Sequence, residues 1–149
     1  MSQKVVVAVM AMLLAGCTTD ISRRAPFDSS VGRSLVTKRA TFLYRDSPTV
    51  SPPDWCKIPN LEDEARVRSP GDYRRLQQEA SVPAGQKLRV HRVLNEVSDG
   101  AVFYYAMGEV FVPSLGRFVE FRYEWGFNGE INRAPWEATE VLQVRHVTW

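Results

Sequence analysis

A strict alternation of apolar and charged residues in the C-terminal half constrains the fold more than any other feature of this sequence. The apolar members are Val119, Phe121, Tyr123 and Trp125, and the charged members between them are Glu120, Arg122 and Glu124. Successive side chains of a β-strand point to opposite faces, so a period of two predicts a sheet with one buried and one solvated face. We therefore expect Phe121, at the centre of the apolar face, to be a core residue.

The flanking segments have the same character. Two further strands are expected at Lys87–Val97 and Ala101–Val112, joined by the turn signal Ser98-Asp99-Gly100. Pro113–Gly116 makes the next turn, and Glu140–Trp149 gives a last strand. Three consecutive antiparallel strands and a terminal strand predict a mainly β fold, either a small antiparallel barrel or a curved sheet.

The remaining segments are less regular. Leu35–Arg45 predicts one strand, or two strands separated near Lys38-Arg39, and Gly126–Pro135 is expected to be a loop. Leu61–Ala80 is the one plausible helical stretch. In it, Ser69-Pro70-Gly71-Asp72 has the composition of a helix start. The apolar residues that would then share one helical face are Tyr73, Leu76 and Ala80.

The segment Val82–Val90, with the sequence VPAGQKLRV, forms a turn followed by a strand. It resembles the same element in bacterial Src-homology-like small β-barrels. The resemblance is confined to these residues and implies a small barrel architecture.

The N-terminus has the pattern of a targeting signal. Lys4 precedes an uninterrupted apolar run from Val5 to Ala15, which is well short of the ~20 residues that a membrane-spanning helix needs. The run ends in Leu14-Ala15-Gly16-Cys17, where small residues stand directly before a cysteine. The alternative interpretation is a short buried strand or helix that ends in an ordinary cysteine.

The motif Leu14-Ala15-Gly16-Cys17 resembles the lipobox of bacterial lipoproteins. The resemblance covers residues 1–17. It implies that residues 1–16 are a signal peptide, that the Cys17 thiolate receives a diacylglyceryl group, and that acyl chains of the palmitate type anchor the mature protein to a membrane. Thr18 follows the cysteine where Asp tends to retain lipoproteins in the inner membrane. The resemblance therefore implies the outer membrane, facing the periplasm.

Polar residues follow this motif, and we expect residues 17–30 to be a flexible tether and residues 31–149 to form a single β-rich domain. Lys and Arg number 19 against 17 Asp and Glu, and this near-neutral balance argues against nucleic-acid binding. Cys56 would have no disulfide partner if Cys17 carries lipid. It is either a reactive or intermolecular thiol, or a small buried hydrophobe, which is the favoured interpretation.

The sequence contains no recognisable catalytic constellation or metal-binding spacing, and no cofactor is implied. His91 and His146 lie on separate expected strands and are interpreted as polar surface residues. Two function classes remain. The first is a non-catalytic binding or structural module of the cell envelope, with a protein or peptidoglycan as partner. The second is an enzyme that acts on cell-wall material through carboxylates or histidines that the sequence does not identify.

More than half of the aromatic residues lie between residues 101 and 127, and most are expected to fill the core. Adjacent Tyr104 and Tyr105 would point to opposite faces of a strand, so at least one is a candidate partner contact. Trp136 stands in a loop-like context and is the residue most suspected of contacting a partner.

Overall fold

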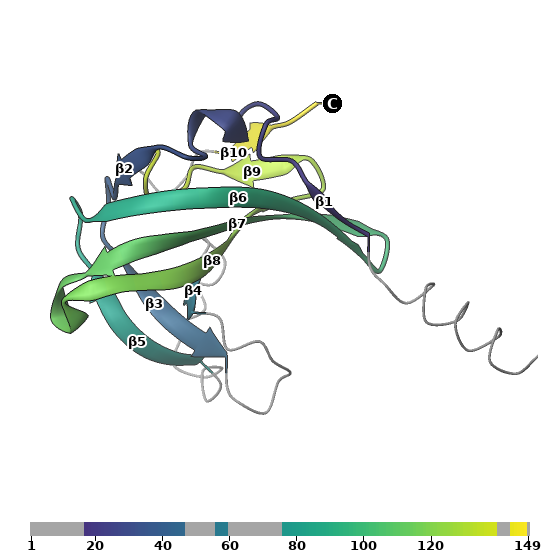
Figure 1. The fold of residues 1–149 in the computed structure, drawn as a ribbon. Coiled ribbons are helices and arrows are strands. Elements are labelled where there is room, and N and C mark those ends of the chain that lie inside the picture. The colour runs from purple at the N-terminus through teal and green to yellow at the C-terminus, as the bar shows by residue number, and fades with distance from the viewer. Residues whose placement is uncertain (1–16, 47–55, 60–75, 140–143, 149) are drawn as a thin grey trace, which may run out of the picture.

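The computed structural model describes residues 17–46, 56–59, 76–139 and 144–148, and its strands belong to one curved sheet (Figure 1). The elements are β1 (Thr18–Asp20), η1 (Phe27–Ser29), β2 (Ser34–Val36), β3 (Thr41–Asp46), β4 (Cys56–Ile58), β5 (Leu76–Val82), β6 (Lys87–Ser98), β7 (Ala101–Val112), η2 (Pro113–Leu115), β8 (Arg117–Phe127), β9 (Glu130–Asn132) and β10 (Val144–His146). The prediction of a mainly β fold with a curved sheet is therefore confirmed.

The three long strands β6, β7 and β8 pair consecutively and antiparallel, as the sequence predicts. The β6–β7 connection is a tight turn in which Asp99 and Gly100 both have positive φ, at 51° and 78°. A two-residue turn of this kind matches the twist of the strands that it joins, and Asp-Gly is among the residue pairs that favour it. At the other end of β7, η2 leads into β8, and Gly116 adopts the left-handed conformation with φ of 61°.

The neighbouring strands follow the order β1-β6-β7-β8-β4-β3-β5, with β2 also paired to β6 and the β9–β10 pair attached to β8. The sheet is mixed, because β4 runs parallel to β8 while every other named pair is antiparallel in the described residues. It curves without closing. Of the two architectures that the sequence predicts, the curved sheet is correct and the closed antiparallel barrel is not.

The inner face of the sheet carries the core. Phe121, Tyr123 and Trp125 of β8 are fully buried, which confirms the face predicted from the alternation. Phe121 lies opposite Gly108 on β7. A Cβ atom on Gly108 would lie 3.0 Å from the Phe121 ring and would clash with the backbone carbonyl of Arg89. The glycine therefore makes room for the phenylalanine at the centre of the core.

The segment expected to be a tether is instead part of the fold. Strand β1 begins at Thr18 and pairs with β6, and the side chains of Ile21 and Phe27 are buried. The ring of Phe27 lies 4.9 Å from that of Trp125 and 6.0 Å from that of Tyr104, measured between centroids. Burial of a large ring against the sheet removes apolar surface from water and stabilises the packing of this segment. The prediction of a flexible segment over residues 17–30, with a domain that starts near Val31, is wrong.

Two further predictions are corrected. The C-terminal part of the expected helix, from Leu76, is strand β5, which pairs antiparallel with β3. Residues 61–75 of that expected helix lie outside the described residues. The expected loop Gly126–Pro135 contains the end of β8 and all of β9. At β5, pairing with the distant strand β3 overrides the local pattern. The end of β8 and β9 instead form a local hairpin, whose turn residues Asn128 and Gly129 both have positive φ.

The outcome at the remaining segments is closer to expectation. The region Leu35–Arg45 forms two strands, β2 and β3, which is the second of the two alternatives. Of the expected last strand, Val144–His146 is β10, and residues 140–143 lie outside the described residues.

Candidate interaction surface

The structure places the sequence-predicted site residues in different environments. Cys17 is exposed and free, and it is the residue directly before β1. Trp136 and Tyr104 are buried, with 3% and 4% of their surface exposed. These two residues therefore belong to the core, and the expectation that they contact a partner does not fit their burial. Tyr105 is half-buried on the outer face of the sheet, so the two adjacent tyrosines do point to opposite faces.

Trp136 is turned inward by a short turn that sequence inspection does not reveal. The amide of Glu137 donates to the carbonyl of Ala134 at 2.9 Å, which closes the turn. The Trp136 ring then lies 5.2 Å from the rings of both Tyr123 and Trp125, in edge-to-face geometry. Such contacts add to the energy of burial. A loop-like composition is therefore a poor guide to exposure at this position.

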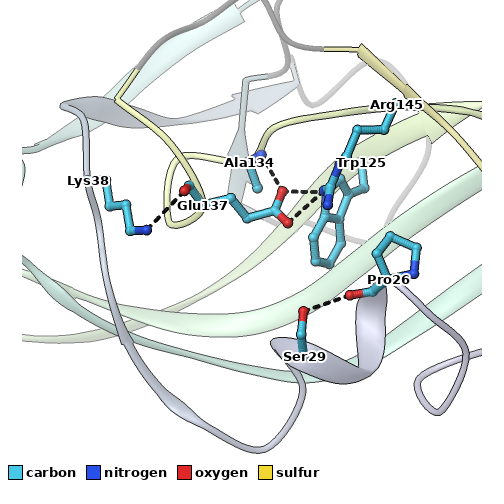
Figure 2. A network of polar contacts seen from close by, with 7 residues as sticks. All are labelled: Pro26, Ser29, Lys38, Trp125, Ala134, Glu137 and Arg145. Atoms are coloured by element: carbon cyan, nitrogen blue, oxygen red, sulfur yellow. Dashed lines mark hydrogen bonds and ion pairs between the residues drawn. The ribbon is translucent and has the colours of Figure 1, made fainter.

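Glu137 is the centre of the polar network in Figure 2. Its carboxylate accepts hydrogen bonds from the indole Nε1 of Trp125 at 3.2 Å and from the backbone amide of Ala134 at 2.8 Å. The guanidinium of Arg145 donates to the other oxygen at 2.6 Å. The Glu137 side chain is only 10% exposed. Both carboxylate oxygens accept hydrogen bonds, and the donors come from three parts of the chain. The Glu137 carboxylate therefore holds β8, the 134–137 turn and β10 together.

The two histidines and Cys56 lie apart from one another in the described part of the chain. His91 is exposed on β6 and His146 is exposed on β10, and these two strands are not neighbours in the sheet. Cys56 is buried on β4 with Ile58, in the environment of a small hydrophobe. Within the described residues, no group of three or more His, Cys, Asp or Glu side chains is placed to hold a metal ion.

The outer face of β7 and β8 carries an aromatic cluster that we name the proximal patch, because the strand register places it at the end of the sheet where β1 begins. The proximal patch consists of Phe103, Tyr105 and Phe127. The ring of Phe103 stacks with that of Tyr105 at 6.1 Å and lies 5.1 Å from that of Phe127. Phe127 is 44% exposed. This patch is therefore a continuous aromatic surface that is accessible to solvent.

Charged groups border the proximal patch on one side. The Arg122 guanidinium lies over the Tyr105 ring, 3.6 Å from its centroid, and pairs with the Glu96 carboxylate at 2.9 Å. Burial, followed by the nearby negative charge of Glu124, raises the pKa of the Tyr105 phenol above its ordinary value of about 10. Tyr105 therefore stays neutral at physiological pH and offers a hydroxyl beside an apolar ring.

A second apolar group lies at the opposite end of the same outer face. It is the distal patch, formed by Phe111 and Phe118. The rings of Phe111 and Phe118 meet edge-to-face at 5.5 Å, and Phe118 is 45% exposed. The two patches have similar exposed rings, so what distinguishes them is their distance from Cys17.

The alternation in the sequence does not reveal that Phe127 belongs to the outer face. The pairing of β7 with β8 shifts between Tyr104 and Tyr105, where Trp125 is the extra residue. The shift returns Phe127 to the outer face beside Phe103. A β-bulge of this kind inserts one residue and alters which side chains follow it on each face. An exposed phenylalanine one residue beyond Gly126 could not be assigned without the register.

In the described part of the chain, no helix has the length and hydropathy required to span a bilayer. Comparison with protein families, with curated proteins and with solved structures finds no match for this chain.

Proposed function

We propose that this protein is a lipoprotein of the bacterial cell envelope that is anchored by lipid on Cys17. Its β-sheet then serves as a non-catalytic binding or structural module facing the periplasm. Thr18 after the cysteine favours the outer membrane as its location. The observation that carries the proposal is the coincidence of the motif Leu14-Ala15-Gly16-Cys17 with an exposed, free thiol at the residue directly before the first strand.

The contrast between the two cysteines supports this assignment. A thiolate must be accessible to attack a lipid donor and form a thioether. Cys17 is exposed, whereas Cys56 is 6% exposed and packs in the core. A single chain thus contains one cysteine suited to modification and one that serves as its control.

Two observations support a binding or structural role: the hydrogen bonds of Glu137 and the exposed rings on the outer face. The carboxylate of Glu137, whose side chain is 10% exposed, already accepts three hydrogen bonds within the fold. The outer face of β7 and β8, by contrast, presents exposed rings beside the Arg122–Glu96 ion pair. Exposed rings flanked by charge are typical of contact surfaces.

Metabolic labelling with a fatty acid tests the anchor. Wild-type protein and the Cys56→Ala variant should incorporate the label and sediment with membranes. The Cys17→Ala variant should incorporate none and appear in the soluble fraction. An unlabelled wild-type protein would contradict the proposal.

Incubation of the full-length protein with peptidoglycan fragments and with native envelope proteins tests the proposed binding or structural role. Saturable retention without turnover supports a binding module. Release of soluble cell-wall fragments would contradict it and would identify an enzyme instead.

A further inference from the structure

We propose that the end of the sheet beside Cys17 lies in the membrane interface, with the proximal patch in contact with the lipid. The occupant of this patch is then the surface of the bilayer that holds the anchor. The inference rests on the lipid attachment proposed above and adds an orientation for the domain. It follows from the strand register, from the exposed side chains at this end and from the absence of a spacer after Cys17.

The register places Cys17 at the same end of the sheet as the proximal patch. The backbone carbonyl of Cys17 accepts a hydrogen bond from the amide of Val97. One residue further along, Thr18 lies opposite Glu96, Glu96 lies opposite Phe103, and Phe103 lies opposite Phe127. Neighbouring strands are about 4.8 Å apart, so Phe103 lies about 10 Å and Phe127 about 15 Å from Thr18 across the sheet.

No flexible segment separates Cys17 from the row of paired residues that runs from Thr18 to Phe127. Strand pairing begins at Thr18, directly after the cysteine. Acyl chains attached to Cys17 enter the hydrocarbon region, so the sulfur must lie at the boundary between headgroups and acyl chains. The headgroup region accounts for about 5–8 Å on each side of a bilayer. The end of the sheet is therefore held against the membrane surface.

The side chains at this end suit that position. Val97 is 40% exposed and Phe127 is 44% exposed, and they come from the inner and outer faces respectively. Aromatic rings, particularly a tyrosine that keeps its hydroxyl, favour the membrane interface. The exposed Asp99 at the hairpin tip carries a charge that is costly in hydrocarbon. It limits the depth of this end to the headgroup layer.

The distal patch provides an internal control. It lies at the opposite end of β7, a strand of 12 residues, and Figure 1 shows the η2 connection far from β1. A strand of this length spans roughly 35–40 Å. A sheet held end-on at Cys17 therefore keeps Phe118 in water while Phe127 contacts lipid, although the two rings have similar exposure.

The test uses full-length lipidated protein with Cys56→Ala, reconstituted into vesicles of phosphatidylethanolamine and phosphatidylglycerol. An environment-sensitive fluorophore is attached at Ser98→Cys, in the β6–β7 tip, or at Ser114→Cys, in the β7–β8 connection. Nitroxide-labelled lipids should quench the probe at position 98 and leave the probe at position 114 unaffected. Phe127→Ser should weaken the quenching at position 98, whereas the matched Phe118→Ser should not.

The outcomes separate this inference from the proposed function. Lipid on Cys17 with equal quenching at both positions, or with quenching at neither, would overturn the orientation and leave the anchor intact. Absence of lipid on Cys17 would overturn the proposed function itself. If Phe127→Ser prevents folding, the comparison of positions 98 and 114 in the otherwise unchanged protein still decides the orientation.

Discussion

The backbone carbonyl of Cys17 accepts a hydrogen bond from the amide of Val97, with 3.2 Å between oxygen and nitrogen. The first residue of the proposed mature chain is therefore already tied to the central sheet. In the proposed lipid-anchored protein, this contact leaves no linker between the lipid and the sheet.

The first prediction concerns this contact. A Gly-Ser linker of about six residues, inserted between Cys17 and Thr18, should add a reach of about 20 Å. Lipid attachment should persist, and the stability of the fold should change little because β1 keeps its pairing. Quenching of the Ser98→Cys probe by nitroxide lipids should fall, because the sheet end is free to leave the membrane surface. Unchanged quenching would mean that the proximal patch binds lipid without help from the anchor.

The second prediction tests whether the segment before β2 belongs to the core. Phe27 is fully buried against Trp125 and Tyr104. Truncation of such a ring to alanine costs about 3–5 kcal/mol of unfolding free energy. Phe127→Ala, which removes a ring that is 44% exposed, should cost about 1 kcal/mol. Denaturant unfolding followed by tryptophan fluorescence measures both. Equally small losses of unfolding free energy in the two variants would show that residues 17–30 do not contribute to the core.

The third prediction addresses Glu137. Glu137→Ala leaves the buried indole N–H of Trp125 and the amide of Ala134 without their acceptor, and it removes the partner of Arg145. Hydrogen bonds to charged groups contribute about 1.5–3 kcal/mol each, so the unfolding free energy should fall by about 3 kcal/mol or more.

The control for Glu137 is Lys38→Ala. The Lys38 ammonium donates to the backbone carbonyl of Glu137 at 3.0 Å but is exposed (Figure 2). Its removal should cost about 0.5 kcal/mol or less. Thermal melts of the two variants give the comparison, and equal midpoints would show that the Glu137 carboxylate does not hold the three segments together.

Particular residues show where the sequence was informative. The burial of Phe121, Tyr123 and Trp125 could be predicted because apolar and charged residues alternate strictly within β8 itself, from Val119 to Trp125. The Asp99-Gly100 turn could also be predicted, because few residue pairs tolerate two consecutive positive φ angles.

Other positions depend on contacts that are distant in the chain. Leu76–Val82 contains the helix-favouring residues Gln77, Gln78 and Glu79, yet pairing with β3 makes it a strand. Ile21 and Phe27 are isolated apolar residues in a polar segment, so no periodicity marks them. Their burial follows from packing against the sheet. The exposure of Phe127 depends on a register shift in β7–β8 pairing that no local pattern reports.

The fourth prediction uses the phenol of Tyr105. Its pKa is raised first by burial and then by the charge of Glu124, while Arg122 acts in the opposite direction. Glu124→Gln should therefore lower the pKa of Tyr105, and Arg122→Gln should raise it. Titration of the labelled tyrosine ring by NMR measures both shifts. An unchanged or higher pKa in Glu124→Gln would contradict the account of this surface.

The same shift has a consequence for stability. The pKa of Tyr105 is higher in the folded state than in the unfolded state. Its contribution to the free energy of unfolding is therefore fully present below pH 10. It is lost as the pH rises through the folded-state value. Tyr105→Phe should show a smaller loss of stability in this alkaline range than the wild-type protein.

The mass of the N-terminal peptide, measured on protein isolated from bacterial membranes, tests the central claim most directly. The account predicts a chain that begins at Cys17, with the mass of a diacylglyceryl group on sulfur and, where the amino group is also acylated, of one further acyl chain. A chain that retains residues 1–16, or one in which Cys17 carries an unmodified thiol, would contradict it.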